Sequence, residues 1–161
     1  MSKVNGLRTK AEKVLASISA LDKNGYALNS ILAISENLDK EIESAAQIEG
    51  PLSGEFLVIK DNIESVGLPA TAGSLALANT PVEKDSSISA RIKAAGGLII
   101  AAANLSEWAN IRSSNSTSGW SAVGGLTANP WIYSHNAGGS SSGTGAAVAS
   151  GLFSFGVGTR S

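Results

Sequence analysis

A cluster of three serines between glycines constrains this chain more than any other stretch. It reads Gly138-Gly139-Ser140-Ser141-Ser142-Gly143 and leads into an alanine-rich run at residues 144–149. Glycines allow left-handed backbone angles and close approaches, and alanines favour a helix. The pattern therefore predicts a tight turn that enters a helix, with unpaired N–H groups at the start of the helix. Hydroxyl groups held there could relay protons or bind an oxyanion, and the alternative interpretation is a flexible Gly/Ser linker.

The composition indicates a single domain with a buried core. The chain has 161 residues, 43% of them hydrophobic and 16% charged, and a formal net charge of −1. That balance gives no electrostatic footprint for nucleic acid. The absence of cysteine and the presence of only one histidine, His135, exclude disulfides and multi-histidine metal sites. We find no signal peptide and no apolar run long enough to span a membrane, so we expect a cytoplasmic protein.

The hydrophobic pattern predicts an α/β chain. Helices are expected over residues 9–21, 35–47 with Ser35 as the N-cap, 88–95 after a Ser86 or Ser87 cap, and 143–149. Strands are expected over residues 28–34, 56–59, 98–103 and 153–157. The strand–helix–strand succession around residues 56–103 is typical of a βαβ unit. Residues 112–125 are polar and rich in glycine and serine, which predicts a long irregular loop.

Several catalytic templates fit the serine cluster only in part. The G-x-S-x-G elbow requires a histidine after the serine, whereas His135 precedes it. Nucleotide-binding loops fit poorly, because Thr144 stands where a Walker lysine is needed and Val148 stands at the third glycine of G-x-G-x-x-G. A Ser/Lys pair needs no histidine, and Lys60 follows the apolar run at residues 56–59. Burial there would lower the pKa of Lys60 from about 10.4, whereas the simpler interpretation is a lysine that reaches solvent at a strand exit.

Four segments together resemble the N-terminal part of the amidase signature family. They are Val58-Ile59-Lys60-Asp61-Asn62, Thr71-Ala72-Gly73-Ser74, Asn104-Leu105-Ser106-Glu107-Trp108-Ala109 and the serine cluster. Asn110, Ser118-Gly119-Trp120-Ser121 and Asn129-Pro130 are similar to the peptide amidase branch. The segments occur in the family's order, so we interpret residues 1–161 as the N-terminal portion of one amidase domain. A helical segment at 1–27 would precede the signature core at 28–161.

The resemblance implies a mixed β-sheet covered by helices and hydrolysis of a carboxamide C–N bond by a Ser–cis-Ser–Lys mechanism. Lys60 matches the family's lysine, Ser140 matches the bridging cis-serine, and Ser141 matches a serine that supports the hydrogen-bond network. We therefore expect the Lys60 amine to lie about 2.6–3.2 Å from the Ser140 hydroxyl. The resemblance also implies a cis peptide bond beside a serine of the cluster, and the alternative is relaxation to trans in a chain without the nucleophile loop. No metal or organic cofactor is implied, and the substrate would be a small amide or a peptide amide.

The chain departs from the family near its last residues. The family's nucleophilic serine follows a Gly-Thr pair that matches Gly158-Thr159, and the register places this serine beyond Ser161. Arg160 stands where an acidic residue is usual. We therefore expect an incomplete fold that is inactive by itself, with strands 98–103 and 153–157 left unpaired and open to self-association. The alternative is a non-catalytic binding or interaction module on an amidase scaffold.

Overall fold

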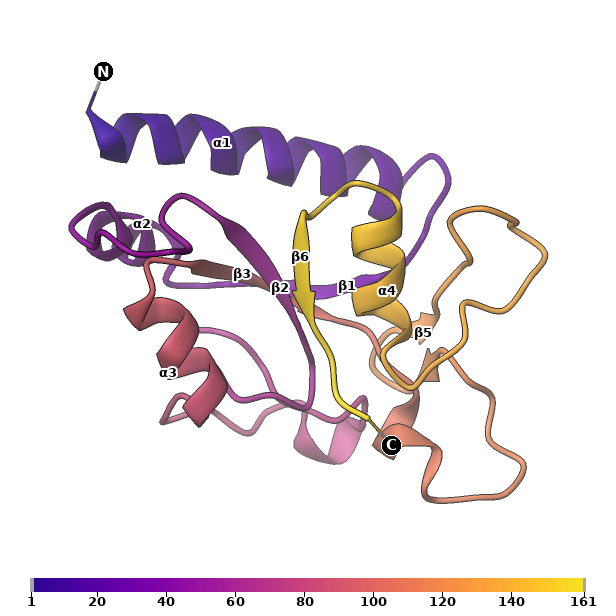
Figure 1. Cartoon of the computed structure of the whole chain (residues 1–161). Coiled ribbons are helices and arrows are strands. Elements are labelled where there is room, and N and C mark those ends of the chain that lie inside the picture. The colour runs from indigo at the N-terminus through magenta and orange to yellow at the C-terminus, as the bar shows by residue number, and fades with distance from the viewer. Residues whose placement is uncertain (1, 161) are drawn as a thin grey trace.

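The most apolar runs of the chain form the centre of a mixed four-stranded sheet (Figure 1). The computed structural model describes residues 2–160. Its strand order is β1 (Ile31–Ile34), β3 (Leu98–Ala103), β2 (Phe56–Lys60) and β6 (Phe155–Val157). β1 is antiparallel to β3, and the other two neighbouring pairs are parallel. β2 and β3 are buried along their whole length, as inner strands covered on both faces usually are, and the predicted α/β class is confirmed.

The predicted βαβ unit is present between β2 and β3. It contains α3 (Ser87–Ala94), and the Ser86 side chain caps this helix by accepting a hydrogen bond from the backbone N–H of Ser89. Gly96 follows the helix at φ 85°, a left-handed angle that glycine adopts without steric penalty. The chain can therefore turn sharply from α3 into the parallel strand β3.

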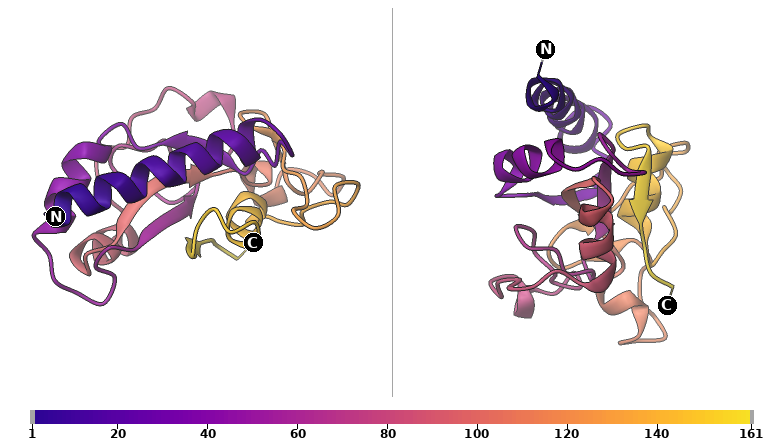
Figure 2. Two further views of the ribbon diagram at one scale, coloured as in Figure 1. Left: turned by 90° about the horizontal axis from the view of Figure 1, so that it is seen from above. Right: turned by 60° about the vertical axis from the view of Figure 1, so that its left-hand side comes forward.

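Two hydrophobic clusters pack against the sheet. Alternate residues of a strand face opposite sides, and accordingly Val58 belongs to one cluster and Ile59 to the other. The first cluster includes residues of α1 (Lys3–Ser17), α2 (Leu38–Ala46) and α4 (Ser142–Ala149), and the second includes α3. α1 runs along the top of the molecule in Figure 1 and crosses over the sheet when seen from above (Figure 2). Helices thus cover the sheet as predicted.

The first helix begins earlier than its pattern of apolar residues predicts. It starts at Lys3 because Ser2 serves as the N-cap and accepts a hydrogen bond from the backbone N–H of Asn5 at 3.3 Å. It then continues into a π-helical turn at Ile18–Lys23. Capping by Ser2 therefore extends the helix over residues whose side chains are mostly exposed.

Two local predictions before α2 are wrong. Ala27 and Asn29 have φ angles of 51° and 53°, which a strand cannot contain, so the strand predicted from residue 28 begins only at Ile31. Ser35 does not cap α2, because its hydroxyl accepts the backbone N–H of Asn37 at 3.2 Å. Asn37 occupies the N-cap position and makes no side-chain capping bond. Ser35 therefore closes the turn that precedes the helix.

The expectation that residues 98–103 lack a neighbouring strand is wrong. β3 lies between β1 and β2, and Ala103 pairs with Ile31 on one side and with Lys60 on the other. β6 pairs with β2 on one side only and is, like β1, an edge strand of the sheet; its Phe155 is 45% exposed. Self-association through an open strand edge therefore stays a prediction for β6 alone.

The segment predicted as irregular at residues 112–125 contains short ordered elements. β4 (Trp120–Ser121) and β5 (Gly125–Leu126) pair as a small antiparallel hairpin. A short 3₁₀ turn occurs at Leu75–Leu77, whereas Glu107–Asn110 form a turn in which Trp108 and Ala109 have left-handed φ angles of 49° and 54°. Within residues 2–160, no helix combines the length and apolar character needed to cross a membrane.

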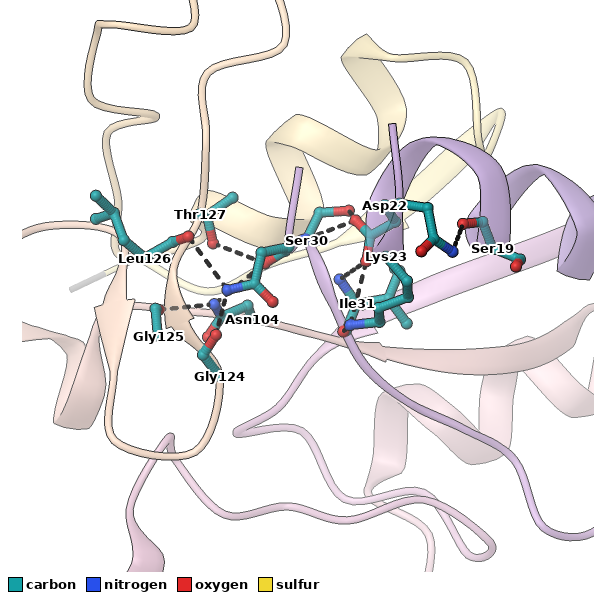
Figure 3. A network of polar contacts seen from close by, with 12 residues as sticks. Ser19, Asp22, Lys23, Ser30, Ile31, Asn104, Gly124, Gly125, Leu126 and Thr127 are labelled. Carbon is teal, nitrogen blue, oxygen red and sulfur yellow. Dashed lines mark hydrogen bonds and ion pairs between the residues drawn. The ribbon is translucent and has the colours of Figure 1, made fainter. Parts of the chain in front are cut away.

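A buried carboxylate fastens the N-terminal segment to the sheet (Figure 3). Asp22 is 1% exposed and accepts hydrogen bonds from the backbone N–H groups of Ser30 at 2.6 Å and Ile31 at 3.2 Å, and from the Ser30 hydroxyl. Lys23 forms an ion pair with it at 3.3 Å. Nearby, the Asn104 side chain donates to two backbone carbonyls, one of them in the hairpin. These hydrogen bonds satisfy backbone groups just before and at the start of β1 and one in the hairpin.

Replacing Asp22 with alanine is expected to lower the free energy of unfolding by about 2 to 4 kcal/mol. The change leaves two buried N–H groups without an acceptor, and each such loss costs about 1 to 3 kcal/mol. Urea unfolding followed by circular dichroism measures the effect. Asp39→Ala is the matched control, because the Asp39 side chain is 83% exposed, and we expect a change within about 0.5 kcal/mol. An equal decrease in the free energy of unfolding of the two variants would contradict the proposed role of Asp22 in attaching the N-terminal segment to the sheet.

Candidate active site

Lys60 and Ser140 meet at the carboxyl end of β2. Lys60 is the last residue of the strand and is 0% exposed. Its Nζ donates a hydrogen bond to the Ser140 Oγ at 2.6 Å, although the two residues are 80 positions apart. The distance lies within the predicted range of about 2.6 to 3.2 Å. The alternative interpretation, a Lys60 side chain that reaches solvent at the end of the strand, is therefore wrong.

The serine cluster is a packed turn and not a flexible linker. Ser140 and Ser142 are 5% and 2% exposed, and the Ser140 carbonyl accepts a hydrogen bond from the backbone N–H of Ser106 at 3.0 Å. The peptide bond between Gly139 and Ser140 is cis, at one of the predicted positions. α4 begins at Ser142, as the alanine-rich run predicts. The turn thus presents Ser140 from a fixed backbone.

Thr159 is a hydroxyl partner of Lys60 that the sequence analysis did not identify. Its Oγ1 accepts a hydrogen bond from Lys60 Nζ at 2.8 Å and another from the side-chain amide of Asn62 at 3.1 Å. The signal was present, because Asn62 and Thr159 both belong to segments that resemble the amidase signature. Ser161, which the register excludes as the nucleophile, lies outside the described residues.

Ser141 connects the serine turn to the segment after β6. Its hydroxyl donates to the Thr159 carbonyl at 3.1 Å and accepts the Thr159 backbone N–H at 3.2 Å. One side chain therefore satisfies both backbone groups of Thr159. This two-way contact holds Thr159 beside Lys60 and gives Ser141 a positioning role in the geometry.

Asp61 fastens a loop beside the same strand end and does not neutralise Lys60. Its buried carboxylate accepts hydrogen bonds from the backbone N–H groups of Thr71 and Gly73, each at 3.2 Å, and from the Thr71 hydroxyl. Burial raises the pKa of Asp61, against the effect of these hydrogen bonds. Among residues 2–160, no carboxylate forms an ion pair with Lys60. The partners of the amine are instead hydroxyl and carbonyl oxygens.

Burial lowers the pKa of the Lys60 amine from its ordinary value of 10.5. Removing an ammonium group from water disfavours its charged form. A lowered pKa increases the fraction of neutral amine at a given pH, and only the neutral amine can accept a proton. The environment of Lys60 is therefore suited to a general base.

The titration of Lys60 is expected to make the chain more stable as the pH rises. Between the lowered pKa of the folded chain and about 10.4 in the unfolded chain, the unfolded chain binds more protons, so the free energy of unfolding increases with pH. Below that window the cost of burying the ammonium is fully present. Urea unfolding of the chain and of Lys60→Met across this window isolates the contribution. A difference between the two proteins that stays constant with pH would contradict it.

An open pocket lies over the serines. Its volume is about 400 Å³, and its lining residues are Ala109, Asn110, Gly139, Ser140, Ser141, Thr159 and Arg160. Ala109 and Asn110 have left-handed φ angles of 54° and 68°, and the Asn110 side-chain amide donates to the Ser118 hydroxyl at 2.9 Å. The pocket is large enough for a small ligand, and Ser140 and Ser141 form part of its wall.

The structure gives no support to a histidine-dependent serine site or to a metal site among the described residues. His135 is exposed and contacts the hydroxyl of Ser134 at 3.4 Å. Within the described residues, no group of three histidine, cysteine or acidic side chains could hold a metal ion. The arrangement at the end of β2 is instead a buried amine against hydroxyl groups, which can pass a proton from one oxygen to the amine and back.

The chain is similar to known proteins over most of its length. A family model described as Amidase matches residues 10–160. A crystal structure of the peptide amidase PAM with the inhibitor chymostatin superimposes with a TM-score of 0.89 at 37% identity, covering 99% of this chain and 33% of that one. The native peptide amidase of Stenotrophomonas maltophilia gives a TM-score of 0.85 at 37% identity, covering 96% of this chain and 32% of that one.

A relative found by sequence is also much longer than this chain. One component of the glutamyl-tRNA(Gln) amidotransferase of Methanosarcina mazei is 34% identical over 158 residues, which are 98% of this chain and 28% of the relative. The chain therefore spans about a third or less of the length of the proteins that it matches.

Proposed function

The chain belongs to the amidase family, and we propose that it supplies the proton-transfer half of a hydrolase that cleaves carboxamide C–N bonds. Lys60 would be the proton acceptor, Ser140 the relay, and Ser141 the residue that positions Thr159 beside them. The observation that carries the proposal is the 2.6 Å contact between the fully buried Lys60 amine and the Ser140 hydroxyl. The substrate would be a small amide or a peptide amide, in keeping with the peptide amidases that the chain resembles.

The proposed reaction moves one proton along a row of oxygens to the amine. Neutral Lys60 takes the proton of the Ser140 hydroxyl, while Ser140 takes the proton of a second, nucleophilic serine hydroxyl. The deprotonated oxygen attacks the amide carbon, the C–N bond breaks, and the proton returns by the same route to the leaving nitrogen. Water then attacks the acyl-enzyme in the same way and releases the acid.

The nucleophilic serine in this scheme belongs to a segment beyond Ser161, as the register of the amidase signature implies. We therefore propose that the 161 residues by themselves hydrolyse no amide. Lys60 and Ser140 would have no alkoxide to form, and the donors that stabilise the tetrahedral oxyanion would be missing as well, each worth roughly 3 to 4 kcal/mol of barrier. A chain of this length would act only together with the remainder of an amidase domain.

A graft tests the proposal. Residues 1–159 are joined to the part of Stenotrophomonas maltophilia peptide amidase that follows its matching segment, and release of ammonia from a peptide amide is measured. We expect turnover by the graft and none by the 161-residue chain. A serine-directed covalent probe, which should label the graft only, reports the assembled nucleophile independently of turnover. A folded graft that is labelled but shows no turnover, or turnover by the 161-residue chain alone, would contradict the proposal.

A further inference from the structure

Residues 106–110 form a turn that contributes to the wall of the pocket over the serines, and we call it the wall turn. Ala109 and Asn110 line the pocket from this turn. Both have left-handed φ angles, which residues other than glycine keep only where neighbouring contacts determine them. At the start of the turn, the backbone N–H of Ser106 donates a hydrogen bond to the Ser140 carbonyl at 3.0 Å. One end of the wall turn is thus held by the serine cluster.

The wall turn also contacts the loop at residues 71–73, which follows β2. The Ala72 carbonyl accepts a hydrogen bond from the backbone N–H of Trp108 at 2.9 Å. The two segments approach each other closely, because a Cβ added to Gly73 would lie 3.3 Å from the Cα of Glu107. The position of the wall turn relative to the serine cluster therefore depends on where the loop at 71–73 lies.

The carboxylate of Asp61 holds this loop. Asp61 directly follows β2 and is 0% exposed. Its Oδ2 accepts hydrogen bonds from the backbone N–H groups of Thr71 and Gly73, each at 3.2 Å, and from the Thr71 hydroxyl. Its backbone carbonyl accepts the N–H of Ala72 at 2.9 Å. Oδ1 is buried without a hydrogen-bond partner, so the side chain of Asp61 binds the loop through a single oxygen.

We propose that Asp61 is a positioning residue for substrate binding. Its carboxylate places the loop at 71–73, the loop places the wall turn, and the wall turn lines the pocket that receives the amide. This role presupposes the amide hydrolysis proposed for the assembled enzyme, in which Lys60 accepts the proton. Among the described residues, Asp61 forms no ion pair with Lys60, so its loss should leave the proton path in place. A change that removes binding shared by the ground state and the transition state raises KM and leaves kcat unchanged.

Steady-state kinetics of the graft on one peptide amide test the proposal. We expect Asp61→Leu to raise KM about tenfold or more, with kcat within about threefold of the unmodified graft. Asp61→Asn retains an oxygen that can accept from Thr71 and Gly73, so it should keep KM within about threefold. Asp39→Leu is the matched control, because the Asp39 side chain is 83% exposed, and it should leave KM unchanged. A small serine-directed probe should label all these proteins at similar rates, because labelling reports the nucleophile and not the pocket wall.

Backbone amide NMR shifts of the 161-residue chain give a readout that does not depend on hydrolysis. The shifts of Ala109 and Asn110 should change in Asp61→Leu and stay near their original values in Asp61→Asn. A graft that neither turns over nor is labelled would count against the proposed function, and the NMR shifts would still test whether Asp61 positions the wall turn.

The proposal would be overturned by an unchanged KM in a folded Asp61→Leu graft, or by a KM in Asp61→Asn as high as in Asp61→Leu. Unchanged amide shifts at Ala109 and Asn110 would also overturn it. A fall in kcat and in the labelling rate without a rise in KM would assign Asp61 to the proton path instead. Should Asp61→Leu fail to fold, Thr71→Val replaces it, because it removes a hydroxyl that joins the loop to Asp61. An unchanged KM in a folded Thr71→Val graft would equally overturn the proposal.

Discussion

Alanine at position 143 is expected to destabilise the chain by about 3 kcal/mol or more. A Cβ added to Gly143 would lie 2.4 Å from the Ser30 carbonyl oxygen and 2.5 Å from the backbone nitrogen and oxygen of Asn104. All three atoms belong to the main chain, so no side chain can rotate away. They also form hydrogen bonds, from Asn104 N–H to Ser30 at 2.8 Å and from Gly143 N–H to Asn104 at 2.9 Å. Overpacking typically costs about 1 to 3 kcal/mol, and loss of these bonds adds to it.

Gly145 provides the control in the same helix. A Cβ at Gly145 meets no heavy atom within 4 Å, and alanine is the better helix former by about 0.5 to 1 kcal/mol. Gly145→Ala should therefore leave the free energy of unfolding unchanged or raise it slightly. Urea unfolding of the two variants gives the comparison. If both alanines had the same effect, the close approach at Gly143 would not be what holds α4 in place.

The close approach at Gly143 explains how the serine turn is positioned. The first turn of α4 lies directly against the backbone that follows β3 and precedes β1, and only a residue without a side chain fits there. Ser140 and Ser141 are three and two residues earlier, so their location is determined by this contact. The glycine after the serines is therefore required by packing, in addition to any flexibility that it gives to the turn.

The inner strands and the later helices were predictable because their signals are local. Residues 98–103 form a continuous apolar run and become β3 with the expected bounds. Ser86 caps α3, and the alanine-rich run forms α4. The errors arose where the conformation of single residues overrides the apolar pattern. Left-handed Ala27 and Asn29 shorten the first strand, a feature that no hydrophobic periodicity reports.

The contacts of the candidate site were predictable only as far as the resemblance reached. The pairing of Lys60 with Ser140 followed from matched motifs, since nothing local brings together residues 80 positions apart. Thr159 is 99 positions from Lys60, and its role as a hydroxyl partner depends on β6 being parallel to β2. The sequence predicts β6 as a strand but not its place in the sheet. The sequence therefore did not identify Thr159 as a partner of Lys60, although Thr159 lies in a segment that matches the family.

In the grafted enzyme, Lys60→Met and Ser140→Ala are each expected to lower kcat by about 10³- to 10⁵-fold, as losses from coupled catalytic groups do. Methionine keeps much of the length of the buried lysine but cannot accept a proton. Alanine at position 140 removes the oxygen that contacts the amine at 2.6 Å. Because both groups handle the same proton, the double variant should lose little more activity than the more damaging single variant.

The comparison of single and double variants separates a shared proton path from two independent structural effects. Steady-state rates on one peptide amide are measured for the unmodified graft, the two single variants and the double variant. Thermal unfolding checks that each of them is folded. Lys13→Met is the control for loss of a lysine, because Lys13 is an exposed residue of α1, and it should leave kcat unchanged. Losses that multiply in the double variant would mean that Lys60 and Ser140 act separately. In that case the short contact between them would be a feature of packing, and the proton acceptor would have to be sought elsewhere.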